Sequence, residues 1–182
     1  MQLIQPTVDH LQSSLQTLER GWNPLYYNHT VPLTLIEAMK KDPERFISLH
    51  HDPTGELSAQ KFKDGPTKPS IPSITKWMWD GDYAGSIDIR WQYGKTDLPV
   101  NSNGHIGYTV PPWKRKKGYA QKALQLFLKE IKNMGLAFVT IHTEMDNTAS
   151  QNVILKYGGE FREYFAIEKS LGGGIGKNFI FI

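Results

Sequence analysis

The segment His105–Met134 constrains the fold more than any other part of the chain. Its first part, His105–Val110, is a short apolar run typical of a strand, and the basic run Lys114–Lys117 and Gly118 follow it. From Ala120 onward the apolar residues recur every three or four positions, which predicts an amphipathic helix. A strand that turns through a glycine into a helix favours a layered α/β protein.

The rest of the chain predicts helices and strands on both sides of this unit. Helices are expected at Val8–Leu18, Thr34–Lys41, Pro43–Leu49 and Thr148–Tyr157, and strands at Leu3–Ile4, Ile74–Trp79, Tyr83–Gln92, Phe138–Glu144, Glu160–Ile167 and Asn178–Ile182. The turn Asp80-Gly81 joins two of these strands into an antiparallel hairpin. This order predicts a mixed α/β (α+β) fold and excludes a purely doubly wound sheet.

Composition limits the classes of protein to which the chain can belong. Its 182 residues predict one domain, 1–182, and the absence of cysteine excludes disulfides and thiolate metal sites, so no metal is expected. No apolar stretch approaches the roughly twenty residues of a membrane helix, so we expect a cytoplasmic protein. The net charge of +3 permits an anionic ligand but lacks the clustered basic face of a nucleic-acid binder.

The basic turn is a candidate phosphate site. Backbone N–H groups at a helix start have no intrahelical acceptor and lie at the positive end of the helix dipole. Gly118 lets the backbone approach a ligand, and Lys114–Lys117 add positive charge at the same place. The alternative is an ordinary strand-to-helix turn with a solvated basic face. Neither a Walker phosphate loop nor a dinucleotide-binding glycine pattern follows any predicted strand.

Two motifs resemble those of the GNAT acetyltransferase superfamily. Arg115-x-x-Gly118-x-Ala120 is similar to the signature Gln/Arg-x-x-Gly-x-Gly/Ala, and Asn147-Thr-Ala-Ser150 is similar to the Asn-x-x-Ser region of that family. The resemblance covers about residues 74 to 165 and is closest to a poorly characterised bacterial subgroup. It implies a mostly antiparallel central sheet flanked by helices, with two parallel strands splayed apart at an acyl-CoA site.

The resemblance also implies the residues that bind acetyl-CoA. The backbone of one strand end would pair with the pantetheine arm, here Tyr108, Thr109 and Val110. The pyrophosphate would lie in the turn formed by Arg115, Lys116, Lys117, Gly118, Tyr119, Ala120 and Gln121. Asn147 and Ser150 would lie beside the arm.

Three residues are candidates for the general base of an acetyl transfer to an amine. His142 stands where some family members place a catalytic glutamate, His105 stands where others do, and Glu144 lies two residues from His142 on the same strand face. An imidazole with its ordinary pKa near 6.5 suits this task. Each histidine is alternatively a half-buried residue hydrogen-bonded to the backbone.

One departure from the family concerns the general acid. Ile154 stands where many members carry a tyrosine, and Tyr157, three residues further on, is better interpreted as a packing residue. The proton for the leaving thiolate would then come from water, or the rate would rest on proximity alone.

The sequence therefore predicts an acetyl-CoA-dependent N-acetyltransferase acting on a primary amine of a small molecule or peptide. The alternatives are a non-catalytic acyl-CoA-binding module and, more weakly, an RNA-associated protein. Candidates for the acceptor cleft are Trp22, Tyr26, Tyr27, Trp77, Trp79, Arg90 and Trp91. The apolar C-terminal segment Phe179–Ile182 is a candidate edge for a homodimer.

Overall fold

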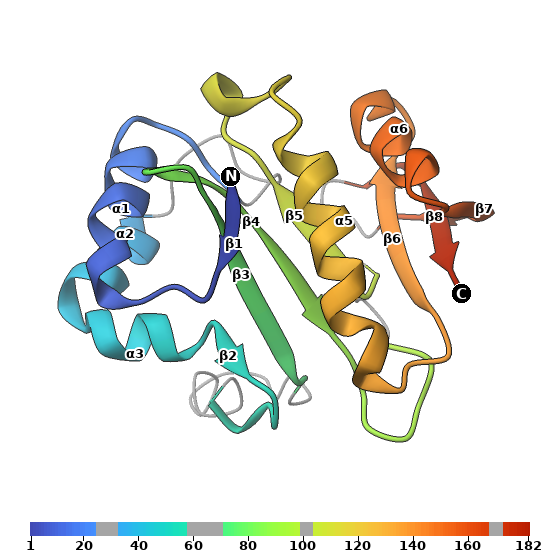
Figure 1. Cartoon of the computed structure of the whole chain (residues 1–182), viewed down its shortest axis with the longest axis horizontal. Coiled ribbons are helices and arrows are strands. Elements are labelled where there is room, and N and C mark those ends of the chain that lie inside the picture. The colour runs from blue at the N-terminus through green and yellow to red at the C-terminus, as the bar shows by residue number, and fades with distance from the viewer. Residues whose placement is uncertain (25–32, 58–70, 99–103, 168–172) are drawn as a thin grey trace.

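Two antiparallel sheets form the centre of the computed structural model (Figure 1), which describes residues 1–24, 33–57, 71–98, 104–167 and 173–182. The first sheet has the order β1-β3-β4-β5, and β2 pairs with the first two residues of β3. Its strands are β1 (Gln2–Ile4), β2 (His51–Asp52), β3 (Ser73–Trp79), β4 (Tyr83–Arg90) and β5 (Ile106–Thr109). The second sheet has the order β6-β8-β7, with β6 (Val139–Glu144), β7 (Glu160–Ala166) and β8 (Ile175–Phe181).

The helices lie in two groups (Figure 1). The first group stands beside β1 and β3 and contains α1 (Leu11–Glu19), α2 (Leu33–Lys41) and α3 (Pro43–Ser48). The second group contains α5 (Tyr119–Ile131), which crosses β4 and β5, and α6 (Thr148–Lys156), which stands beside β6. Short 3₁₀ turns precede α1 at Val8–His10, lie between β5 and α5 at Pro112–Lys114 and follow α5 at Lys132–Met134. No helix in the described ranges is long and apolar enough to span a membrane.

Local capping chemistry explains where the early helices begin. The Asp42 side chain accepts a hydrogen bond from the backbone N–H of Arg45 at 3.0 Å, and Pro43 occupies the first helical position of α3. Thr7 stands at the N-cap of the 3₁₀ turn that precedes α1, where its backbone N–H donates to Nδ1 of His10 at 3.1 Å. Both starts confirm the expectation from the sequence.

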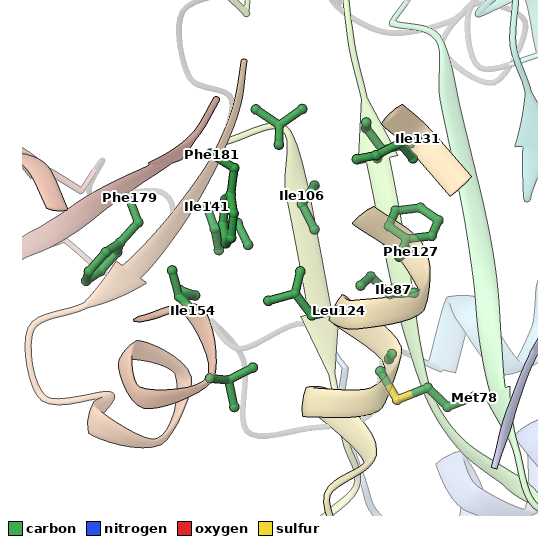
Figure 2. Packing of buried hydrophobic residues seen from close by; sticks show 14 of the residues in the cluster. Met78, Ile87, Ile106, Leu124, Phe127, Ile131, Ile141, Ile154, Phe179 and Phe181 are labelled. Carbon is green, nitrogen blue, oxygen red and sulfur yellow. The ribbon is translucent and has the colours of Figure 1, made fainter. Parts of the chain in front are cut away.

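The amphipathic face of α5 forms the main core (Figure 2). Leu124, Phe127 and Ile131 are buried against the strands of the first sheet, including Ile87 and Ile106. The same cluster continues to the second sheet with Ile141, Phe179 and Phe181, and to α6 with Ile154. Fully burying one such side chain is worth about 1.5–3 kcal/mol, so this continuous cluster joins the two sheets although few hydrogen bonds do.

Strands β5 and β6 diverge, as the resemblance implied. Both run towards the end of the molecule where α5 and α6 begin (Figure 1). Among the described residues, backbone pairing between the two segments is limited to their start, through an antiparallel bridge between Gly104 and Ile141 and a 2.8 Å bond from His105 N–H to the Thr140 carbonyl. The strands are therefore joined at one end and separated at the other.

The expected dimer edge at Phe179–Ile182 is wrong. Strand β8 lies between β6 and β7, and Phe179 pairs with Ile141 on one side and with Phe161 on the other. Both edges of β8 are therefore occupied by hydrogen-bonded neighbours, and β7 is the outer strand of this sheet. A homodimer stays a prediction, without this segment as its edge.

Candidate active site

The turn between β5 and α5 is open. Gly118 is the N-cap of α5 and has a left-handed backbone with φ 77°. A Cβ atom built on Gly118 would meet no protein atom within 4 Å. Lys116 also has a positive φ of 60°, and it is the only non-glycine residue with this property among the described residues. The chain therefore accepts backbone strain of about 1–2 kcal/mol in order to shape this turn.

The backbone N–H groups of the turn are available to a ligand. The first helical bond of α5 runs from Lys122 N–H to the Gly118 carbonyl at 3.0 Å. Within the described residues, the N–H groups of residues 116–121 donate to no protein acceptor. These donors and the positive end of the α5 dipole lie at the same place, so the turn fits a pyrophosphate group.

The four basic side chains of the turn have different partners. Lys114 forms an ion pair with Asp80 at 2.9 Å, and Arg115 donates from Nε to the Val110 carbonyl at 3.0 Å. In the described part of the chain, Lys116 and Lys117 form no ion pair and are exposed. These two lysines therefore carry the charge that is available to an anion.

Asp80 ties the turn to the β3–β4 hairpin. It receives hydrogen bonds from Lys114 and from the Tyr119 hydroxyl. Burial raises the pKa of Asp80, but the hydrogen bonds from Tyr119 and Lys114 outweigh it and hold the pKa at about 2. The Tyr119 ring is thus anchored by an ionised carboxylate at the first residue of α5.

Strand β5 presents one backbone edge to β4 and the other to β6. Arg90 N–H donates to the His105 carbonyl at 2.9 Å, and in an antiparallel ladder the hydrogen-bonded pairs alternate. This alternation directs the backbone of Gly107 and Thr109 towards β4, and that of Ile106 and Tyr108 towards β6. A Cβ on Gly85 would collide with the Thr109 carbonyl oxygen, which agrees with this direction.

Tyr108 and Ser150 meet across the opening between β5 and α6. The Tyr108 hydroxyl lies 2.7 Å from Ser150 Oγ, and it also donates to the Ser150 carbonyl at 3.3 Å. Two residues that were predicted to lie beside the coenzyme arm are therefore brought together by the fold.

Asn147 is the N-cap of α6, where its Oδ1 accepts from Ser150 N–H at 3.1 Å. We expect Asn147→Ala to lower the free energy of unfolding by about 1 kcal/mol, because it removes the cap. Asn147→Asp keeps the cap but lacks the amide N–H₂ donor, so it should keep the stability and weaken coenzyme A binding about tenfold. Calorimetric titration of both variants measures this. Wild-type affinity in both would show that Asn147 serves only as a cap.

His105 is a buried residue with both ring nitrogens occupied. It is 3% exposed, and its Nδ1 accepts from Thr140 N–H at 3.1 Å. Its Nε2 lies 3.1 Å from the Thr96 carbonyl, so Nε2 carries the proton and donates. Burial is the main reason that the pKa of His105 lies below its ordinary value. These contacts match the alternative interpretation of His105 as a histidine that is hydrogen-bonded to the backbone. Its role as a base stays a prediction.

His142 is half-buried in the middle of β6. Its ring stacks on Phe165 with the ring centroids 4.2 Å apart, and its Nδ1 is buried without a partner among the described residues. Burial first, and then the charges of Arg90 and His105, lower its pKa to about 4 against the opposing effect of Glu163. The expectation of an imidazole that titrates near 6.5 is therefore wrong, and His142 is neutral at pH 7. Glu144, the third candidate, is exposed at the end of β6.

Polar side chains surround His142 on the sheet faces opposite α5. Arg90 forms an ion pair with Asp88 at 2.7 Å. Its Nη2 lies so close to Gly107 that a Cβ atom added to this glycine would be 2.7 Å away. On the second sheet Asn178, the cross-strand partner of His142, donates to Glu163 at 3.2 Å. The sequence analysis missed Asp88, Asn178 and Glu163. For Asp88, the polar residues at alternate positions of β4 were a usable signal.

Unsatisfied atoms mark this polar region. In the described residues, Arg90 Nε, His142 Nδ1 and Asn178 Oδ1 are buried without a hydrogen-bond partner. Buried polar atoms usually have partners, so a group of them indicates a place where water or a ligand completes the bonding.

Ile154 stands where many family members carry the general-acid tyrosine, and both it and the nearby Tyr157 pack in the core. Ile154 is 0% exposed and packs in the main cluster (Figure 2), and Tyr157 is half-buried against the same cluster. Tyr157 is thus placed as the packing residue that the sequence indicated.

A cavity of about 880 Å³ lies between the helices α1–α3 and the strands β3 and β4. Trp22 and Trp77, two of the predicted acceptor residues, line it, whereas Trp91 is buried in the main core and Trp79 packs against His10. Tyr26 and Tyr27 lie outside the described residues. The lining residues that the sequence analysis missed include Phe46, His50 and Tyr83.

The separated strands and the open, basic helix start fit an extended, phosphorylated ligand. A family model described as an acetyltransferase (GNAT) domain matches residues 33–160. The chain therefore belongs to the GNAT acetyltransferase family. The protein is an N-acetyltransferase, and acetyl-CoA is its co-substrate.

Solved structures share the fold at low sequence identity. Mycobacterium smegmatis RimJ in complex with CoA-disulfide has a TM-score of 0.66 and 15% identity, covering 98% of this chain and 80% of that one. RimL, a ribosomal L7/L12 alpha-N-protein acetyltransferase in complex with coenzyme A, has a TM-score of 0.64 and 12% identity over 99% and 92% of the two chains. The microcin C7 self-immunity acetyltransferase MccE, in complex with acetyl-CoA and AMP, has a TM-score of 0.60 and 14% identity over 99% and 91%. A search of curated proteins found no match.

Proposed function

We propose that the protein transfers the acetyl group of acetyl-CoA directly to a primary amine of a small molecule or peptide, with His142 as the general base. The observation that carries this proposal is the set of backbone N–H groups at residues 116–121, which have no protein acceptor among the described residues and lie at an open helix start beside two exposed lysines. In this position the pyrophosphate lies at one end of the opening between β5 and β6.

The length of β5 then sets the position of the thioester. From Val110 back to Ile106 an extended chain covers about 13 Å. A pantetheine arm that runs along this edge from the turn reaches the point where β5 and β6 come together, near His105 and Thr140. His142, on the neighbouring strand, lies beside this end of the opening.

The reaction needs a neutral amine and a place for its proton. The amine nitrogen bonds to the thioester carbonyl carbon, and the carbon–sulfur bond then breaks to give the amide and the coenzyme A thiolate. The proton lost by the amine passes to Nε2 of His142, since Nδ1 is buried. From there it returns to solvent, and water protonates the thiolate.

The contacts of the three candidate bases favour His142. The two ring nitrogens of His105 are already hydrogen-bonded, and Glu144 lies at the exposed end of the strand. The low pKa of His142 keeps its ring unprotonated at neutral pH, but it also makes the ring a weaker base than a free imidazole. The positive charge of Arg90 contributes to the low pKa of His142. Negative charge that develops at the thioester has the opposite sign, so it would raise the pKa of His142 during the reaction.

We expect acetyl-CoA to be consumed only when a suitable amine is present. Release of free thiol is measured against a panel of small amines and of peptides with free N-termini, with acetyl-CoA binding measured by calorimetry in parallel. Thiol release with one class of amine and formation of the acetylated product by mass spectrometry support the proposal. Binding of acetyl-CoA without turnover of any amine would favour the non-catalytic module instead.

The cellular setting stays a prediction. A cytoplasmic location, a possible homodimer and the absence of a nucleic-acid partner follow from the sequence argument and are part of the proposal.

A further inference from the structure

Five aromatic rings form a continuous chain along the cavity between α1–α3 and the first sheet. Each neighbouring pair is in edge-on or tilted contact: Phe46 with His50 at 5.1 Å, His50 with Trp77 at 5.4 Å, Trp77 with Tyr83 at 4.8 Å, and Tyr83 with Trp22 at 6.0 Å. All five line the cavity of about 880 Å³. Rings in such contacts hold one another in place, so this wall is a preformed surface for a planar group.

The cavity opens on the sheet face that carries the polar groups of the active site. Thr75 and Ser86 form part of its floor, and Ser86 is the cross-strand partner of Thr109 on β5. Ile87, the next residue on β4, faces α5, so Ser86 points to the opposite side. Adjacent strands lie about 5 Å apart, and a ligand body in the cavity therefore ends one strand away from the opening between β5 and β6.

The charges of the described lining residues do not suit a bound ammonium group. Asp42 is the only carboxylate among them, and it already caps α3 through the Arg45 N–H. The other charged lining residues are Lys41 and Arg45, which repel a cation. The cavity therefore holds the uncharged body of an acceptor, and the amine lies outside it, towards β5.

His50 supplies a hydrogen-bond acceptor in this apolar wall. Its Nδ1 lies 3.1 Å from the Phe46 carbonyl, which only accepts, so Nδ1 carries the proton. Burial lowers the pKa of His50 more than the carbonyls of Phe46 and Ile47 raise it, so the ring is neutral at pH 7. Nε2 is then an acceptor, and no donor in the described part of the chain reaches it.

We propose that this cavity selects the acceptor, and that the acceptor is an arylalkylamine whose planar ring carries a hydroxyl or N–H donor directed at Nε2 of His50. The inference rests on the proposed function and names the substrate class of the same site. The ring of the acceptor packs against the aromatic wall and its donor binds His50. A short alkyl chain carries the amine from the cavity floor at Thr75 across Asp88, the cross-strand partner of Thr75, towards the thioester.

Matched amines test each part of this inference. Tyramine has a ring and a donor, phenethylamine has only the ring, and 2-cyclohexylethylamine has neither planarity nor donor. We expect kcat/KM to fall about tenfold at each step, which is the loss expected for one hydrogen bond or one set of ring contacts. Spermidine should be a poor acceptor, because the cavity offers no carboxylate for its charges.

Variants of His50 separate recognition from folding. His50→Phe keeps an aromatic ring and removes the acceptor, so tyramine should fall to the level of phenethylamine while phenethylamine is unchanged. His51→Phe, at the exposed neighbouring position, is the matched control and should keep the preference for tyramine. Phe46→Leu should reduce the preference for both arylamines over the cyclohexyl compound. Coenzyme A affinity, measured by calorimetry, should stay at the wild-type value in all three.

The outcomes distinguish this inference from the proposed function. If the protein acetylates peptides or spermidine but discriminates none of the three matched amines, the inference is wrong and the proposed function stands. If no amine is acetylated, the proposed function fails, and direct titration of tyramine into the coenzyme A complex decides the inference. Binding of tyramine that His50→Phe weakens about tenfold supports the aryl site, and no binding overturns it.

Discussion

Gly118→Val is expected to weaken coenzyme A binding by at least about a hundredfold, because it removes two features on which the phosphate site depends. Gly118 has φ 77°, a conformation that costs a β-branched residue about 1–2 kcal/mol. The new side chain would also occupy open space beside the N–H groups of residues 116–121. About 2.7 kcal/mol of lost binding energy corresponds to a hundredfold change, and isothermal titration with coenzyme A measures it.

The matched control is Gly135→Val, at the other end of the same helical segment. Gly135 has φ 72° and, like Gly118, its Cβ would meet no protein atom within 4 Å. The two substitutions should therefore lower the melting temperature by similar amounts, while only Gly118→Val affects the ligand. Equal coenzyme A affinities in the two variants would remove the pyrophosphate from this turn.

The open start of α5 at Gly118 was predictable because its signals are local in the sequence. A glycine between a basic run and an amphipathic helix indicates both the helix start and its open donors, and the burial of Leu124, Phe127 and Ile131 confirms the helical face. The order of strands and helices likewise predicted the mixed fold, whereas the diverging strands were implied only by the family resemblance. The left-handed backbone at Lys116 had no such signal, because lysine rarely adopts it.

The environment of His142 was not predictable, because it comes from three other strands that are distant in sequence. Arg90 lies on β4, Glu163 on β7 and Asn178 on β8, and only the pairing of these strands brings them near β6. The position of β8 between β6 and β7 follows from the same long-range pairing, which no short motif encodes. A periodic pattern shows that a residue is in a strand, but not which strands lie beside it.

The aromatic wall shows the same limit. Trp22 and Trp77 were recognised as candidates from their residue type, yet nothing in the sequence joined them to Phe46, His50 and Tyr83. Phe46 lies on α3 and His50 just after it, whereas Trp77 lies on β3 and Tyr83 on β4. The register of the β3–β4 hairpin sets the Trp77–Tyr83 contact. His50, which the sequence analysis did not single out, is half-buried.

The low pKa of three histidines predicts how stability depends on pH. His142, His105 and His50 all have pKa values below 6.5 in the folded protein, so the unfolded chain binds more protons in acid. The free energy of unfolding should be unaffected by these groups above about pH 6.5 and should fall as the pH decreases towards 4. His142→Ala should reduce this fall, which urea titrations at pH 4.5 and 7 measure.

His142→Ala is expected to lower kcat by at least about a hundredfold, since general base catalysis contributes a hundredfold to ten-thousandfold. The dissociation constant of coenzyme A should change little, because His142 lies at the thioester end and not at the phosphate turn. A pKa of about 4 places the acid limb of kcat/KM near pH 4, well below the limb caused by deprotonation of the acceptor amine. The substitution should remove the acid limb and leave the alkaline one.

Two controls separate proton transfer from packing. Phe165→Leu removes the ring that stacks on His142 but leaves the imidazole in place, so kcat should fall far less than in His142→Ala. His51→Ala removes an exposed histidine far along the first sheet and should have no effect. If His142→Ala keeps near-normal kcat and the same pH profile, the proton leaves through Glu144, through water or through the substrate, and His142 is not the base. A hundredfold loss in Phe165→Leu as well would instead make the position of the ring, and not its basicity, the property that the reaction needs.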